Sequence, residues 1–311
     1  SRHKRMRRAM KIGVVRVVLV LFLMVSAAPA PLSKRVLAFS GDTSDEKPGP
    51  QATLKPASAS VPDIPFVEYD SQTERQLLAL ANQARAQAGA PSLTLDAGLT
   101  QAARTHAQAM FSARQLSHQF ANEPSLAQRL ADSTRVQLDQ EAENVALDYS
   151  AADAQQHLML SPPHRTNLLN PAYNVVGLGV IRSGDRLYIV QDFGHALPTY
   201  SLAEVKSTIA YAVAQARKQA RQPALGMSEL PVADDAACSM AQADKLGTAP
   251  VHQLAQRYSV LAYTSLHPET LPESAGQALS SHNLRSFSVG TCYARTATYP
   301  TGVYWVVLSL D

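Results

Sequence analysis

The sequence predicts a protein of the α+β class that contains two copies of one fold. Runs with helical periodicity alternate with runs typical of strands, and the strands come in pairs. The Gln-Ala-Arg triplet at residues 83–85 recurs at residues 215–217, an offset of 132 residues that also relates Pro91 to Pro223. Self-similarity of this kind indicates an internal duplication.

The N-terminal segment has the pattern of a secretory signal. Residues 2–16 hold seven basic side chains, residues 12–25 are apolar apart from Arg16, and small residues follow at 26–30. An uncleaved single-span anchor is the alternative, but the apolar run is shorter than the roughly 20 residues that a span needs. We therefore expect residues 1–30 to be a signal peptide. The mature protein would then be secreted, periplasmic or held in the cell envelope, without a stable membrane span.

Removal of this segment would change the net charge. Seven of the 28 basic residues would be lost, which leaves 21 against 25 acidic residues. A chain with this balance lacks the basic surface that tracks a nucleic acid, so no nucleic-acid partner is expected. Residues 31–68 are rich in Pro, Ser, Ala, Lys and Asp without apolar periodicity, and they predict a disordered linker.

The first copy, expected over residues 69–198, begins with helical patterns. One runs from 72 to 88 and closes at Gly89, a helix-end signal. Asp96 is a candidate N-cap for a second helix that extends to Met110. Later patterns predict helices over 124–131 and 151–160, an extended piece over 93–95, and strands over 175–181 and 187–193 joined by a turn at 183–185.

The second copy, expected over residues 199–311, repeats the strand pair at 287–293 and 302–310. It shows no counterpart to the polar segment Ser161–Pro171 and no Glu-Asn pair after its second helix. We interpret it as a degenerate copy that kept its core and lost its site. Its two cysteines, Cys238 and Cys292, predict either one disulfide, as is usual in exported proteins, or two buried free thiols.

The order of polar motifs resembles the CAP superfamily of cysteine-rich secretory proteins, antigen 5 and pathogenesis-related proteins, which has many bacterial secreted members. The resemblance covers about residues 72–195. It implies an α-β-α sandwich with a central antiparallel sheet. The motifs that carry it are Gln83-Ala84-Arg85, Ser117-His118, Glu143-Asn144, Ser161–Pro171, Gly177-Leu178-Gly179 and Gln191-Asp192-Phe193.

The family's central cleft is typically lined by two histidines and two acidic residues. The resemblance places His118 at the first histidine and Glu143 at one acidic position. Residues 191–192 stand where animal and plant members carry a His-Tyr-Thr-Gln type motif, and Ser161 falls near the second acidic position. Bacterial members often carry Ser-Pro-x-His-Arg instead, which implies a cleft role for His164 that is not equivalent to the family's second histidine.

The expected binding site combines these residues with their polar neighbours. Two histidines and a glutamate can bind zinc and leave an open position for water, so His118, Glu143 and His164 are candidate zinc ligands. The sequence identifies no catalytic residue, since it has neither a His-Glu-x-x-His helix motif nor a Gly-x-Ser-x-Gly elbow. The full set of candidate cleft residues is His118, Glu143, Asn144, His164, Arg165 and Asp192.

Simpler structural roles compete with these assignments. His118 could cap a helix end, Glu143 could belong to a solvated acidic patch, and the polar residues of 164–170 could satisfy loop backbone groups. Arg165 could instead pair with Glu143 or Asp192. His106 lies on the apolar stripe of the second helix and is expected in the core, and the offset of 132 places Cys238 at its equivalent position.

Three functions remain open at this point. The leading one is a secreted, non-catalytic binding module whose polar cleft takes a metal ion, a lipid or an envelope component. A metal-dependent hydrolase or peptidase with Glu143 as its base is the second. The third is a structural or partner-binding envelope protein.

Overall fold

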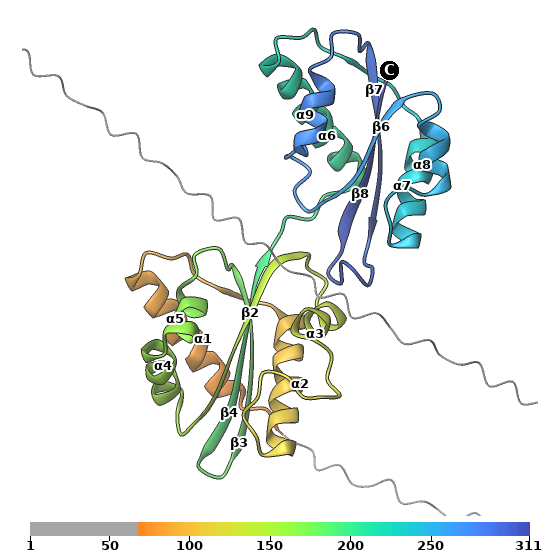
Figure 1. The fold of residues 1–311 in the computed structure, drawn as a ribbon. Helices are drawn as coiled ribbons and strands as arrows, with labels where there is room; N and C mark the ends of the chain where they lie inside the picture. Colours follow the sequence, from red (N-terminus) through yellow and green to blue (C-terminus); the bar gives the residue numbers. More distant parts are fainter. Residues whose placement is uncertain (1–67) are drawn as a thin grey trace, which may run out of the picture. The chain divides into compact units, whose positions relative to one another are not determined.

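The computed structural model describes residues 68–311, so the predicted signal peptide and almost all of the predicted linker lie outside the described residues. Within this part, the chain forms two four-stranded sheets, each with its own flanking helices (Figure 1). The elements of the first sheet unit are α1 (Ser71–Gln87), β1 (Thr94–Leu95), α2 (Ala97–Ala113), α3 (Leu126–Ser133), β2 (Leu138–Asp148), α4 (Ala151–Leu160), α5 (Pro162–Leu169), β3 (Val175–Ser183) and β4 (Arg186–Ala196). Those of the second are α6 (Leu202–Gln219), β5 (Gly226–Met227), α7 (Pro231–Ala243), α8 (Ala249–Leu254), β6 (Ser259–Ser265), α9 (Glu273–Leu279), β7 (Ser286–Ala294) and β8 (Val303–Leu310).

The first sheet has the strand order β1-β3-β4-β2. Its three long strands pair in antiparallel fashion, as the resemblance implied, whereas the two-residue β1 pairs with β3 in parallel. The turn between β3 and β4 uses Gly184 with a positive φ of 61°, a conformation that costs glycine little. Because β2 is the last strand in this order, one of its edges faces outward.

Helices cover both faces of the first sheet, so the predicted α-β-α sandwich is confirmed (Figure 1). Successive strand residues point to opposite faces. Val176, Leu178 and Val180 pack with α1, α4 and α5, while Ile181 packs with α2. The predicted helix over 151–160 is α4, and Asp96 caps α2 by accepting from the amide of Leu99 at 2.8 Å.

Two glycines let α2 lie directly on the sheet. A Cβ atom on Gly177 would come within 2.1 Å of the Leu99 backbone, and one on Gly179 within 2.3 Å of the Ala103 backbone. Only glycine fits such contacts. This close packing fixes the distance between α2 and the sheet, and with it the position of His106.

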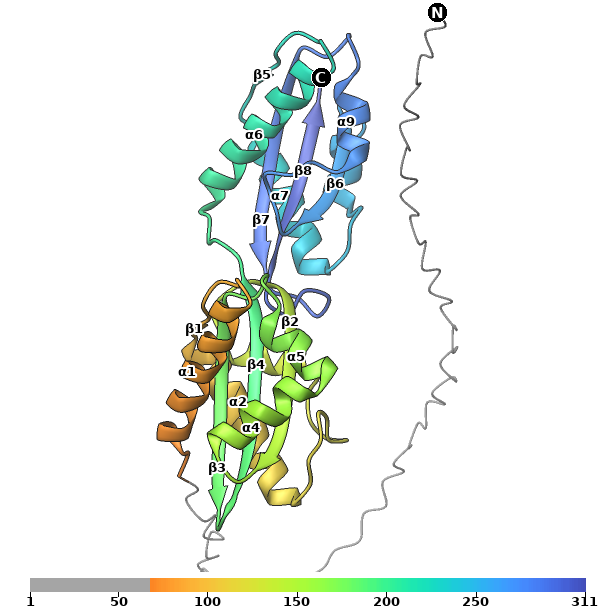
Figure 2. The same ribbon diagram turned by 90° about the vertical axis from the view of Figure 1, so that its left-hand side faces the viewer.

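The second unit repeats the arrangement, with strand order β5-β7-β8-β6, α6 and α9 on one face, and α7 and α8 on the other (Figures 1 and 2). Arg217 corresponds to Arg85. Both are fully buried and their Nη1 atoms donate to main-chain carbonyls at a helix end, Leu168 in the first unit and Leu279 in the second. The two copies therefore share a buried arginine that donates hydrogen bonds to the main chain at a helix end.

These hydrogen bonds identify α9 as the counterpart of α5, at an offset of 111 residues (279 − 168). The expectation that Ser161–Pro171 has no counterpart was therefore wrong at the level of structure. The counterpart helix exists but carries no site residues, since Ala275, Gly276 and Ala278 stand where His164, Arg165 and Asn167 stand in the first unit. In the first unit, Pro162 and Pro163 follow the end of α4 and begin α5, at positions where a missing amide hydrogen costs nothing.

The predicted equivalence of Cys238 and His106 was also wrong. Gly290 packs against the backbone of Ala233 as Gly179 packs against that of Ala103, which relates α7 to α2 by 130 residues (233 − 103). Ala236 therefore replaces His106. The reason is that Ala233 follows Gly226 of β5 by seven residues, whereas the corresponding Ala103 follows Thr94 of β1 by nine.

Candidate functional site

The centre of the site is Glu143, a buried residue of β2 whose side chain points toward α2. Its Oε1 atom lies 2.9 Å from Nδ1 of His118, and its Oε2 atom accepts a hydrogen bond from Nη2 of Arg129. His118 lies in the loop after α2, four residues beyond Arg114, so it does not cap that helix. Arg129, from α3, forms the ion pair that the sequence analysis had considered for Arg165.

His106 belongs to the same cluster. Its ring is fully buried, as expected for a core residue, but both of its nitrogens have polar partners. Nδ1 lies 2.6 Å from Oε1 of Glu123, and Nε2 donates to the carbonyl of Ser117 at 2.8 Å. Because Nε2 is also 3.8 Å from Oε2 of Glu143, His106 connects the two glutamates.

Sequence reasoning missed three members of this cluster: His106 as a polar contact, Glu123 and Arg129. A signal was present for Arg129, which falls three residues after Leu126 and directly before Leu130 on the apolar side of a predicted helix. An arginine at such a position is buried, and a buried arginine needs acceptors such as a carboxylate or main-chain carbonyls. Glu123 carries no comparable signal, since it lies in an irregular loop.

Asp192 lies on β4 directly opposite Glu143 and shares its face of the sheet. The residue is completely buried, and neither carboxyl oxygen has a hydrogen-bond partner within residues 68–311. Burial raises the pKa of Asp192 well above its usual range, and the charge of Glu143 raises it further, while Arg129 acts in the opposite direction. Burial therefore favours the protonated form of Asp192.

Asn144 faces the opposite side of the sheet and does not hold the Glu143 carboxylate. Its Nδ2 atom donates to the carbonyl of His164 at 3.1 Å and to Oε1 of Gln191 at 3.2 Å. Asn167 in turn donates to Oδ1 of Asn144 at 3.0 Å. This buried amide network ties α5 to the sheet and so fixes where His164 lies.

His164 and His118 approach each other at the outer edge of β2, with ring centroids 6.4 Å apart. The side chain of His118 is 57% exposed, so one face of the pair is open to solvent. Burial lowers the pKa of His164, and the neighbouring His118 lowers it further, which favours a neutral ring at pH 7. Arg165 is exposed on the next position of α5.

A groove of about 270 Å³ runs beside this histidine pair along residues 145–148 of β2. His157, Ser161 and His164 line its other side. His157 is held by Asp148, with Nδ1 2.8 Å from Oδ2, and this hydrogen bond raises the pKa of His157. The groove thus places one more basic and one more neutral imidazole along a strand edge.

The three candidate zinc ligands do not fit a metal ion as they stand. Both Glu143 oxygens are already engaged, by His118 and by Arg129. In the described part of the chain, no group of three or more His, Cys, Asp or Glu side chains is placed to hold a metal.

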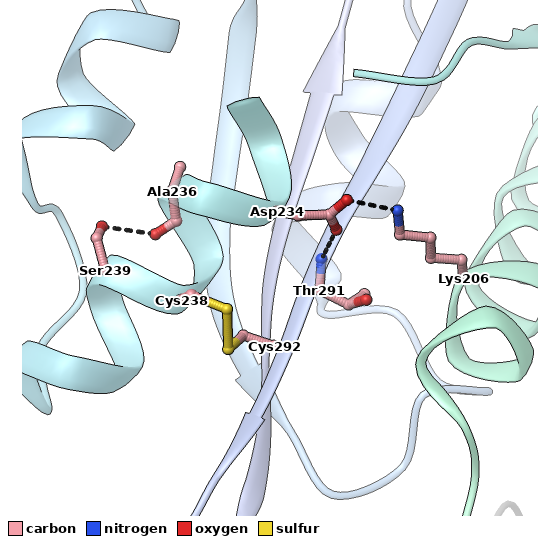
Figure 3. Close-up of a disulfide and its surroundings, with 7 residues drawn as sticks. All are labelled: Lys206, Asp234, Ala236, Cys238, Ser239, Thr291 and Cys292. Atoms are coloured by element: carbon pink, nitrogen blue, oxygen red, sulfur yellow. Dashed lines mark hydrogen bonds and ion pairs between the residues drawn. A yellow bond between two sulfur atoms is a disulfide. The ribbon is translucent and has the colours of Figure 1, made fainter. Parts of the chain in front are cut away.

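The second unit has apolar or small residues at the positions of this cluster. The register of the two sheets relates β2 and β4 to β6 and β8 by 117 residues, since Val145 and Val190 pair as Ala262 and Val307 do. The residues that replace Glu143, Asn144, Gln191 and Asp192 are Val260, Leu261, Leu308 and Ser309. The unit instead contains the disulfide Cys238–Cys292, which joins α7 to β7 (Figure 3).

Part of the chain is similar to a known protein family. Residues 78–193 match the family model of the cysteine-rich secretory protein family, CAP. A protein of Bacillus subtilis (strain 168) described as the uncharacterized membrane protein YlbC is 31% identical over 141 residues, which are 45% of this chain and 39% of that protein. The chain therefore spans less than half the length of this relative. Within residues 68–311, no helix is long and apolar enough to cross a membrane.

The chain also has distant similarity to solved structures. An extracellular protein with an SCP domain from Bacillus anthracis str. Ames is 25% identical, with a TM-score of 0.37 over 40% of this chain and 41% of that one. The structure of Na-ASP-1 is 10% identical, with a TM-score of 0.43 over 77% of this chain and 89% of that one. Residues 78–193, with the sandwich and the polar cluster described above, match the cysteine-rich secretory protein family and form a CAP domain within the chain.

Proposed function

We propose that this chain is an extracytoplasmic, non-catalytic binding protein whose CAP domain takes a small polar component of the cell envelope. The observation that carries the proposal is the pair His118 and His164, which is open to solvent beside the groove along β2. The imidazoles can donate or accept hydrogen bonds, and the strand edge offers main-chain groups to a ligand.

The geometry around Glu143 favours binding over hydrolysis. A general base must reach a water or a substrate proton. The carboxylate of Glu143 is buried, and its two oxygens contact His118 and Arg129. Asp192 is buried still more deeply. The acidic groups therefore serve to hold His118 and the loop that carries it.

The location outside the cytoplasm is supported by the disulfide Cys238–Cys292, because such bonds persist mainly in oxidising compartments. The secretory pattern of residues 1–30 and the name of the family agree with it.

Isothermal titration calorimetry tests the proposal with three probes: soluble muropeptides, zinc chloride and phosphatidylglycerol vesicles. We expect saturable binding of a muropeptide, weakened at least about tenfold, or about 1.4 kcal/mol, in His118→Ala and His164→Ala. His282→Ala, which removes an exposed histidine of the second unit, serves as the matched control and should bind as the wild type does.

The contrary outcomes are distinct. Binding of zinc or vesicles alone would replace the proposed ligand class, and binding that survives both histidine substitutions would exclude this site. Hydrolysis of the muropeptide that disappears in Glu143→Gln would show an enzyme instead.

A further inference from the structure

The two units also differ in the segment between their edge strand and the helix that follows. Asp148 at the end of β2 corresponds to Ser265 at the end of β6, at an offset of 117, whereas α5 and α9 are related by 111. The second unit therefore lacks six residues in this connection. Its segment 266–272 has no helix, whereas the corresponding segment 149–161 contains α4.

In the first unit, α4 fills the space between α1 and α5 (Figure 2). Ala151, Ala154 and Leu158 are its buried apolar residues, and they belong to the main core cluster. Leu80 of α1 and Leu169 of α5 pack against this cluster. An α-helix is thus the element that covers this face of the fold.

In the second unit, the same face is open. A cavity of about 810 Å³ lies between α6 and α9, the counterparts of α1 and α5. Ala212 and Ser280, which replace Leu80 and Leu169, line it and enlarge it. A helix about 10 Å across and two turns long occupies a volume on the order of 900 Å³, so the opening can hold about two turns of helix.

The cavity is bordered by an exposed aromatic side chain and by acidic side chains. Tyr211 projects from α6 with 68% of its surface exposed, at the position of the small Ala79 in the first unit. Exposed tyrosines at the margin of a groove are frequent anchors of binding energy. Glu269 and Glu273 lie on the opposite wall and give it a negative charge.

We propose that this cavity is a docking groove for a basic amphipathic helix of a partner protein, which takes the place that α4 takes in the first unit. The small residues of such a helix would face α6, as those of α4 face α1. Lysine or arginine on its flank would meet Glu269 and Glu273. The groove is separate from the histidine pair of the CAP domain, so the proposal does not depend on the function proposed for that pair.

A stapled peptide tests the proposal, because an isolated helix of this length is marginal in water. The peptide carries residues 150–161, with the exposed Asp153 and Gln156 replaced by lysine. The labelled peptide is titrated with the full chain. Its fluorescence anisotropy should show saturable binding. A peptide with glutamate at both positions should bind about tenfold more weakly, since it would face Glu269 and Glu273 with like charge.

Two glycines of the second unit provide a matched pair of variants. A Cβ atom meets nothing within 4 Å at Gly276, which lines the groove, or at Gly226, which lies in β5 outside it. Gly276→Leu should weaken peptide binding about tenfold by filling the groove, as should Tyr211→Ala, whereas Gly226→Leu should leave binding unchanged. Trp305 fluorescence checks that each variant is folded.

The proposal is overturned if the lysine peptide does not saturate, or if Gly276→Leu and Gly226→Leu bind it equally well. It is also overturned if the groove takes only a small apolar dye and not the peptide.

Discussion

Asp192 is a completely buried carboxyl group that opposes the stability of the fold. A carboxyl group without hydrogen-bond partners in the described structure is costly to bury, and a charged one more so. Its neighbours explain the choice of residue, since Glu143 and Arg129 already form a charged pair beside it. Burial favours the protonated form of Asp192, which adds no second negative charge there.

We predict that Asp192→Asn stabilises the folded chain at neutral pH. Burial raises the pKa of Asp192, so the folded state keeps a proton that the unfolded state releases above about pH 4. Stability of the wild type therefore falls as the pH rises from that value toward the raised pKa. The asparagine variant should gain about 1 kcal/mol or more at pH 7 and little at pH 4.

Urea unfolding at both pH values measures this difference. Asp185→Asn, an exposed position in the β3–β4 turn, provides the control and should change neither value by more than about 0.5 kcal/mol. An equal gain for Asp192→Asn at both pH values would show that its effect is not one of protonation.

At the same scale, the sequence predicted some site residues and not others for identifiable reasons. His118, Glu143 and His164 carry family motifs, and the structure brings them together. Asn144 could not be assigned from its place beside Glu143, because adjacent strand residues point to opposite faces. Glu123 was inaccessible to such reasoning, since its contact with His106 depends on the path of an irregular loop.

Among the elements, one ion pair appears in both units with its charges exchanged. Glu74 of α1 accepts from Arg104 of α2 at 2.6 Å and 2.8 Å, and its Oε1 atom also accepts from the amide of Val180. In the second unit, Lys206 of α6 donates to Asp234 of α7 at 2.7 Å, and Asp234 accepts from the amide of Thr291 at 2.9 Å (Figure 3). Thr291 corresponds to Val180 at the offset of 111, so both pairs bind the same strand position.

We predict that the second pair can be converted into the first. Lys206→Glu alone would place two carboxylates together and cost about 1–2 kcal/mol, as would Asp234→Arg, which also removes the acceptor of the Thr291 amide. The double variant should recover most of this loss, because a glutamate at 206 can reach that amide as Glu74 reaches Val180.

A double-mutant cycle in urea, followed by Trp305 fluorescence, gives the coupling energy. Lys218→Glu, on the exposed side of α6, controls for the general effect of the charge change. Additive losses in the double variant would contradict the equivalence of the two pairs.

The elements themselves were largely predictable, and the failures share a cause. The helix over 151–160 and the strand pairs followed from their periodicity. The fixed offset of 132 failed in α7 because a single number cannot describe copies that differ by insertions and deletions. A separate difference of six residues, between β6 and α9, accompanies the lack of a counterpart to α4 in the second unit, and no local pattern marks an element that is absent.

At the scale of the whole molecule, the two units attach the corresponding helices α2 and α7 to their sheets by different interactions. In the first unit, the contact of α2 with its surroundings includes the polar cluster around His106 and Glu143. In the second, Ala236 and Val260 occupy those positions, and the disulfide Cys238–Cys292 joins α7 to β7. We infer that the covalent bond contributes stability in a unit that no longer has the ionic network.

This inference predicts a local effect of removing the disulfide. The bond closes a chain segment with a sequence separation of 54, for which loop entropy gives a stabilisation of about 4 kcal/mol, with typical measured values of about 2–4. The double variant Cys238→Ser/Cys292→Ser should therefore unfold at lower urea when followed by Trp305, the single tryptophan of the chain, which lies in β8.

The first unit supplies the internal control. Hydrogen exchange of the buried amides of β4 should be unchanged in the double variant. In the described structure, β4 pairs only with β2 and β3 of the first unit. Dithiothreitol should reproduce the Trp305 shift in the wild type and have no effect on the variant. If β4 loses protection as much as the surroundings of Trp305, the two units unfold as one, and the disulfide stabilises the polar site as well as its own unit.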